Sequence, residues 1–159
     1  MKHTLKTWLT TSVLGLALVA TASAQMPAQT TPPAAPVQDA QAKAVAAVQG
    51  TWLIMSMNGQ SLADAGVEMA LVMTGNKYQQ VTNGTVDETG TFTIDASKKP
   101  MTLDLKIETG DSAGQLQLGI AEIIGDTKQA VLAEPGVNSR PAGFSDPGAA
   151  IGVIAKRVK

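Results

Sequence analysis

A change of pattern begins at Gly50, where the chain reads Gly50-Thr51-Trp52-Leu53-Ile54-Met55-Ser56-Met57 and then the pair Asn58-Gly59. A mostly apolar run that ends at such a pair is typical of a strand leading into a tight hairpin, because these turns need residues that tolerate positive φ. Trp52 is the only tryptophan in the sequence beyond the first two dozen residues. We therefore expect this stretch to be the first strand of a sheet, with Trp52 facing its core.

Downstream of this stretch, apolar and polar residues alternate with a period of two. The clearest case is the segment 101–107, in which Met101, Leu103, Leu105 and Ile107 alternate with polar residues. One buried face and one wet face explain this pattern. Further strands are expected around Phe92 and Ile94, and at 69–73, 77–82, 116–120, 128–133 and 150–157.

Short turn pairs join these segments: Gly75-Asn76, Asn83-Gly84 and Gly125-Asp126. Strands joined so tightly must be antiparallel neighbours, and no helical pattern after Gly50 is long enough for the crossover that parallel strands need. About eight such strands protect their edges best by closing into a barrel. The predicted fold class is all-β, an antiparallel up-and-down barrel of about eight strands, with a sandwich as the alternative.

The first fifty residues divide into three parts. Residues 1–24 carry Lys2 and Lys6, an apolar run too short for a membrane span, and Ala22-Ser23-Ala24, which together are typical of a secretory signal peptide. Residues 25–39 are rich in proline and alanine and are expected to form a disordered tether. Residues 40–49 are expected to form a short helix with Asp39 as its N-cap, and this helix opens the domain 40–159. We predict an exported protein, periplasmic or secreted after cleavage near Ala24.

The composition of the predicted exported chain excludes several kinds of catalytic and metal site. It has no cysteine, and the one histidine of the sequence, His3, lies in the expected signal peptide. Ser-His-Asp triads, Cys-His pairs and the usual nitrogen and sulfur zinc sites are thereby excluded. The acidic residues are scattered over turns and polar strand faces, so we predict no catalytic, cofactor or metal site and no enzymatic activity. Thirteen acidic side chains face only ten basic ones, because two of the twelve leave with the signal peptide, which disfavours nucleic acid as a partner.

A series of short elements carries a resemblance to a known group of proteins. They are Gln49-Gly50-Thr51-Trp52, Asn58-Gly59, Gly90–Asp95, Lys98–Leu105, Gly119-Ile120, Gly125-Asp126, Pro135-Gly136, and Arg140-Pro141 before Phe144. In this order they resemble an uncharacterised family of small secreted bacterial proteins with a lipocalin-like, calycin-type β-barrel, over about residues 45–159. The resemblance implies a fold and a compartment but no activity. It also implies that Trp52 closes one barrel end and that Lys156 or Arg157 packs across it.

Two functions stay open for such a barrel. The first is the binding of a small apolar or amphipathic ligand between the inward faces of the strands, with a cavity wall formed by Trp52, Ile54, Phe92, Leu103, Leu105, Leu118 and Ile120. A filled core is the alternative explanation of the same residues and is the one that the sequence favours. The second is a protein-interaction module, with an envelope partner or a protease as its target, acting through the long loop 134–149. Neither the ligand, nor the partner, nor the oligomeric state follows from the sequence.

Overall fold

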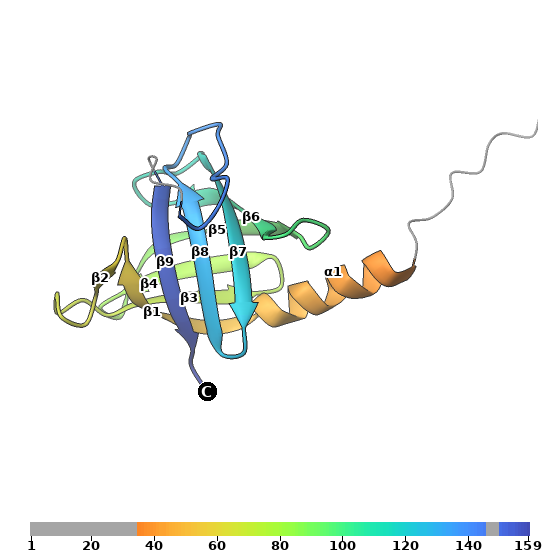
Figure 1. Cartoon of the computed structure of the whole chain (residues 1–159). Helices are drawn as coiled ribbons and strands as arrows, with labels where there is room; N and C mark the ends of the chain where they lie inside the picture. The colour runs from red at the N-terminus through yellow and green to blue at the C-terminus, as the bar shows by residue number, and fades with distance from the viewer. Residues whose placement is uncertain (1–34, 146–149) are drawn as a thin grey trace, which may run out of the picture. The chain divides into compact units, whose positions relative to one another are not determined.

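The computed structural model describes residues 35–145 and 150–159 (Figure 1). The predicted signal peptide and residues 25–34 of the predicted tether lie outside these residues. Within the described ranges one helix precedes nine strands: α1 (Ala35–Val48), β1 (Gly50–Met57), β2 (Gln60–Ser61), β3 (Met69–Thr74), β4 (Lys77–Thr82), β5 (Thr85–Asp95), β6 (Met101–Thr109), β7 (Leu116–Ile124), β8 (Thr127–Ala133) and β9 (Ala150–Arg157).

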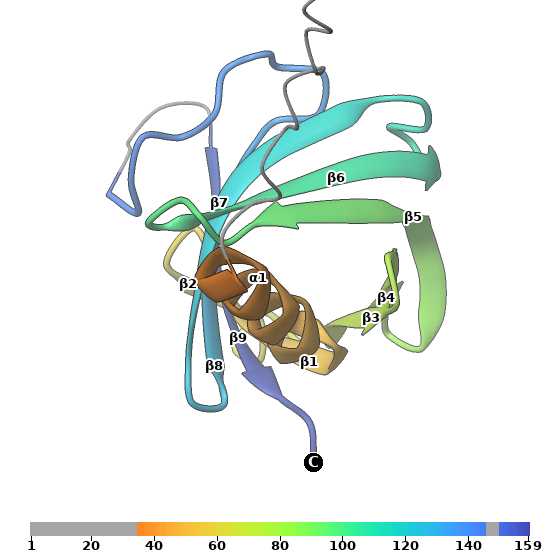
Figure 2. The ribbon, with the colours of Figure 1, turned by 90° about the vertical axis from the view of Figure 1, so that its right-hand side faces the viewer.

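Eight of these strands close into a barrel in which neighbours along the chain are antiparallel neighbours in the sheet. The order runs from β1 through β3, β4, β5, β6, β7 and β8 to β9, and β9 pairs back to β1 with Trp52 opposite Arg157. The two-residue β2 only extends the hairpin that follows β1. Figure 2 shows the ring of strands with α1 in front of it. The predicted all-β antiparallel barrel of about eight strands, preceded by a short helix, is confirmed.

The helix differs from the prediction at its first turns. It begins at Ala35 instead of Ala40, so it takes in the end of the predicted tether and places Asp39 inside the helix instead of at its N-cap. Pro36 lies in the first turn, where a proline is tolerated because the missing N–H would have no helical partner. The helix docks through Gln41, whose amide donates to Ile94 O (2.8 Å) and accepts from Ala96 N (2.9 Å).

Strand β5 is longer than the apolar pattern around Phe92 indicated, because its first half, Thr85–Thr89, carries mostly polar residues. Its pairing with β4 shifts register between Gln80 and Val81, and its pairing with β6 shifts between Thr89 and Gly90. Such bulges bend a strand and increase its twist, which a closed barrel requires. Gly90 is needed at this bend, since a Cβ there would stand 2.1 Å from Lys106 O and 2.8 Å from the ring of Tyr78.

The connection after β8 returns across the outer face of the barrel. Arg140 forms a two-pronged ion pair with Asp104 of β6, with Nη2 2.9 Å from Oδ2, and also donates to Gly119 O of β7. Pro141 beside it is buried. The outer face of the barrel is therefore buried in this region. Ile120 of β7 and its partner Val131 of β8 lie there and are each 4% exposed.

Candidate functional site

The barrel encloses a cavity of about 370 Å³. Every strand of the ring contributes side chains to its wall, which places it in the interior: Ile54, Met57, Met69, Leu71, Tyr78, Gln80, Glu88, Leu103, Leu105, Gln117, Lys128, Ala130, Leu132, Ile151 and Val153. Ser112, Glu134 and Pro135 complete the wall from the β6–β7 and β8–β9 connections. The mouth therefore lies at the barrel end that carries these connections, drawn at the top of Figure 1.

The opposite end of the barrel is closed around Trp52, which is 0% exposed. Its indole Nε1 donates to Val48 O at the end of α1 (2.8 Å). Two cations lie over its ring: the Arg157 guanidinium at 4.2 Å and the Lys128 amine at 4.7 Å from the ring centroid. Arg157 thus takes the place that the lipocalin resemblance assigned to Lys156 or Arg157, whereas Lys156 is exposed.

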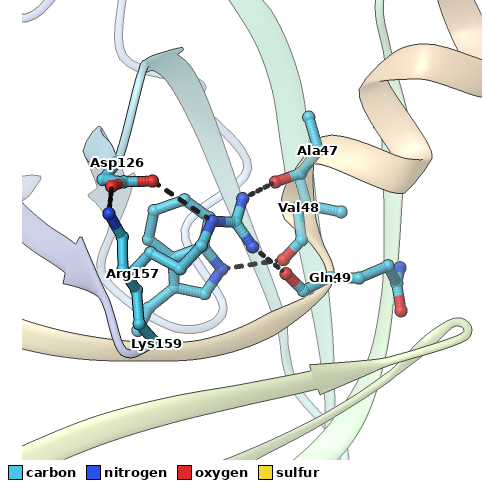
Figure 3. A network of polar contacts seen from close by, with 7 residues as sticks. Ala47, Val48, Gln49, Asp126, Arg157 and Lys159 are labelled. Carbon is cyan, nitrogen blue, oxygen red and sulfur yellow. Dashed lines mark hydrogen bonds and ion pairs between the residues drawn. The ribbon is translucent and has the colours of Figure 1, made fainter.

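Arg157 also holds the end of the helix (Figure 3). Its two terminal nitrogens donate to Gln49 O (2.5 Å) and Ala47 O (2.6 Å), carbonyls that have no helical partner at a C-terminus. On the far side, Asp126 lies 4.0 Å from Arg157 Nε and 3.0 Å from Lys159 Nζ. The guanidinium is therefore engaged in structural contacts and is not available to a molecule in the cavity.

Lys128 is the unusual residue of the closed end. Its side chain is 2% exposed, and its amine contacts Met73 Sδ at 3.5 Å as well as the Trp52 ring. Within residues 35–145 and 150–159 no carboxylate forms an ion pair with it. Burial, and secondly the nearby charge of Arg157, lower the pKa of Lys128 to about 7.

A second polar group of the wall lies on β4 and β5. The Tyr78 hydroxyl donates to Glu88 Oε1 at 2.8 Å. Burial first, and then this carboxylate, raise the pKa of Tyr78 above its ordinary value. Burial also raises the pKa of Glu88, against the lowering effect of the Tyr78 hydrogen bond. Because Tyr78 pairs with Met73, which touches Lys128, Tyr78 lies near the closed end, and its hydrogen bond leads on to Glu88 of β5.

Five of the seven predicted wall residues lie in the interior. Ile54, Leu103 and Leu105 line the cavity, and Trp52 and Phe92 belong to the same buried cluster without forming the wall. The prediction was wrong for Leu118 and Ile120, because these two side chains lie on the outer face of β7. Leu103 pairs with Gly119 and Leu105 with Gln117, so the inward positions of β7 are Gln117, Gly119 and Ala121. A Cβ on Gly119 would meet Leu132, another wall residue, at 2.3 Å.

The polar wall residues that lie on strands were missed: Tyr78, Gln80, Glu88, Gln117 and Lys128. In β8 the inward set is Lys128, Ala130 and Leu132, and the outward set is Gln129, Val131 and Ala133. Each set mixes apolar with polar residues, so alternation alone does not distinguish them. Glu88 lies in the polar half of β5, which no apolar period reveals.

Two further features of the described ranges bear on the kind of site. No group of three or more acidic or histidine side chains within them is placed to hold a metal ion. Among their helices, none has both the length and the apolar character needed to cross a membrane.

No protein-family model matches the chain, and neither a curated protein nor a solved structure matches it. The class of protein is thus defined by the fold and the site alone. It is a small antiparallel β-barrel with an N-terminal helix and an interior cavity whose wall combines eleven apolar residues with seven polar ones.

Proposed function

We propose that this protein is an exported, non-enzymatic binding protein of lipocalin-like type, which holds a small amphipathic molecule inside its barrel. The observation that carries the proposal is the 370 Å³ cavity at the centre of the closed ring. Ligand pockets in proteins begin at roughly 300 Å³. A barrel filled by its own side chains, the alternative explanation of the same core residues, leaves no space of that size.

The composition of the wall supports an amphipathic ligand. Leu71, Leu103, Leu105 and Leu132 provide an apolar lining, which favours a hydrocarbon chain by roughly 25 cal/mol for each Å² removed from water. The rest of the wall is polar: Tyr78, Gln80, Glu88, Ser112, Gln117, Lys128 and Glu134. A predominantly apolar wall with placed polar groups is the usual composition of a small-molecule pocket.

The test is native mass spectrometry of the protein purified from an exporting host, combined with titration of straight-chain amphiphiles. Cleavage of the predicted signal peptide removes Trp8, so Trp52 is the one tryptophan whose emission is followed. We expect a retained small molecule or a saturable change of emission. A bare mass together with an inert tryptophan would refute the proposal.

A pair of variants on adjacent residues of β8 provides the matched control. Ala130 lines the cavity and Gln129 is exposed on the outer face. Ala130→Leu fills part of the cavity and should weaken binding at least tenfold, whereas Gln129→Leu places the same new side chain on the outer face and should leave binding unchanged. Circular dichroism establishes that both variants are folded.

The loop 134–149 as a protein-interaction site stays a prediction. In its described part, Arg140 is paired with Asp104 and Pro141 is buried, so these two side chains hold the loop on the barrel. The contacts therefore favour the cavity as the functional site. Deletion of Pro135–Pro147 with unchanged co-purification of partners would count against the loop.

A further inference from the structure

Lys128 is a residue of the cavity wall whose buried amine forms no ion pair with a carboxylate in the described part of the chain. Among the described residues that line the cavity, Lys128 is the only basic one. Its amine is in contact with a thioether sulfur and an aromatic ring, both of which are weak partners for an ammonium group. A buried charge without a counter-charge is costly, and such residues are concentrated at functional sites.

We propose that Lys128 is the anchor for the head group of the ligand and that this ligand is a carboxylic acid with an apolar chain. The inference rests on the proposed function of the cavity. The lysine stem forms part of the wall, and its four-carbon chain allows the amine to turn from Met73 toward a carboxylate in the cavity. The carboxylate provides the counter-charge that the barrel lacks at this position.

The number of available donors selects a carboxylate over a phosphate. A phosphate carries more charge than a carboxylate and needs several donors, which clustered arginines usually provide. Here the second cation of the closed end, Arg157, already donates to Ala47 and Gln49. A single buried ammonium group matches a singly charged head group.

The acidic residues of the wall determine the orientation of the ligand. Glu88 and Glu134 line the cavity toward its mouth and disfavour an anion there. The carboxylate therefore lies at the Lys128 end, and the apolar chain extends toward the mouth past Leu71, Leu103 and Leu105. The reverse orientation would leave an anion beside carboxylates and a hydrocarbon chain beside the ammonium group.

Binding is coupled to a proton. In the empty barrel, burial and Arg157 hold the pKa of Lys128 at about 7, so the amine is mostly neutral at pH 8. Arg157 is the charged group facing it from β9, and the hydrogen-bonded Tyr78 and Glu88 lie on β4 and β5. A carboxylate beside the amine raises the pKa of Lys128, and the complex takes up nearly one proton at pH 8.

The experiment compares decanoate with decanol, which share a chain length and differ in the head group. Titration calorimetry at pH 8 in two buffers of different ionisation enthalpy measures affinity and proton uptake together. The proteins are the full chain, Lys128→Met, and Lys156→Met, which removes an equal charge from the exposed face of β9. We expect decanoate to bind at least tenfold more tightly than decanol, with uptake of close to one proton, in the full chain and in Lys156→Met. Lys128→Met should bind decanoate and decanol with similar affinity and should take up no proton.

The outcomes separate the two proposals. If decanol binds as tightly as decanoate and no proton is taken up, the cavity is a binding site but Lys128 is not its anchor. If Lys128→Met keeps the preference for decanoate, the anchor is likewise refuted. If neither probe binds the full chain, the proposed function fails together with this inference. Proton uptake is measured on the unmodified chain, so the test does not depend on the folding of a variant.

Discussion

The amine of Lys128 makes the stability of the empty barrel depend on pH. Its pKa of about 7 in the folded chain lies well below the ordinary value of 10.5, so between these values the unfolded chain carries a proton that the folded chain does not. Unfolding is therefore increasingly favoured as the pH falls from 10 toward 7, and the effect ends below 7, where both states are protonated. The full difference corresponds to roughly 5 kcal/mol.

We expect the free energy of unfolding to rise by about 2 kcal/mol between pH 7 and pH 9. Lys128→Met keeps the length of the side chain without its charge, so this rise should disappear and the variant should be more stable than the parent at pH 7. Urea unfolding followed by circular dichroism measures both. The range stays below pH 10 because the raised pKa of Tyr78 adds an opposite dependence above it. An equal slope in parent and variant would show that other groups are responsible.

Arg157 joins the helix to the barrel by two hydrogen bonds and by its position over Trp52. Arg157→Met should lower the free energy of unfolding by about 2 kcal/mol, since hydrogen bonds from a charged group contribute about 1.5–3 kcal/mol each and water replaces them in part. It should also raise the pKa of Lys128, because the repulsion from Arg157 is lost. Lys156→Met, at an exposed neighbour, is the control and should be nearly neutral. Equal effects of the two substitutions would contradict the role of Arg157.

Strand β5 shows how a single glycine shapes an element. Gly90→Ala introduces a methyl group 2.1 Å from Lys106 O, a backbone atom that moves only if the pairing of β5 and β6 shifts. We expect a loss of about 3 kcal/mol of unfolding free energy, at the upper end of overpacking effects. Gly143→Ala, where nothing lies within 4 Å of the new Cβ, is the matched control. Thermal unfolding compares the stability of the two variants. Similar melting temperatures would mean that β5 is not tightly bent at Gly90.

Strand β7 shows where the apolar pattern misleads. Leu118 and Ile120 are its most apolar alternate pair, yet the inward positions are Gln117, Gly119 and Ala121. The outer face of β7 is itself covered, because Arg140 reaches across it to Asp104 and Gly119. When both faces of a strand are buried, the more apolar set is not necessarily the one that faces the core.

Closure of the ring joins residues that are about a hundred positions apart in the sequence. The pairs Trp52 with Arg157 and Ile54 with Ala155 connect β1 to β9. A chain ending at Ile154 loses these pairs and exposes the edge of β1, so we expect it to unfold or to self-associate through that edge. Size-exclusion chromatography with light scattering and circular dichroism detects either result.

The control is a chain that lacks only Lys159, whose ion pair with Asp126 is largely exposed and contributes little. This chain should stay folded, with the elution volume of the parent. A folded, monodisperse chain ending at Ile154 would show that closure of the barrel does not depend on the last residues of β9.

Most strands could be predicted because their signals are local. Alternation in 101–107 and turn pairs such as Asn83-Gly84 depend on a residue and its near neighbours, and Asn83 indeed has a positive φ of 50°. Short turns then force antiparallel neighbours, and eight antiparallel neighbours favour closure. The start of α1 could not be predicted from the sequence in the same way. Hydrogen bonds of Gln41 to Ile94 and Ala96 stabilise helical turns that intrinsic helix propensity alone does not stabilise.

The class of fold, the order of the strands and the absence of histidine and cysteine chemistry from the predicted exported chain were thus available from the amino-acid sequence, because they depend on composition and short-range periodicity. The inward face of β7, the burial of the Lys128 amine and the cavity beside it were not. These depend on which face of each strand the other elements cover and on how completely eight inward rows of side chains fill the ring. Such quantities are sums over contacts between distant residues, and no local pattern contains them.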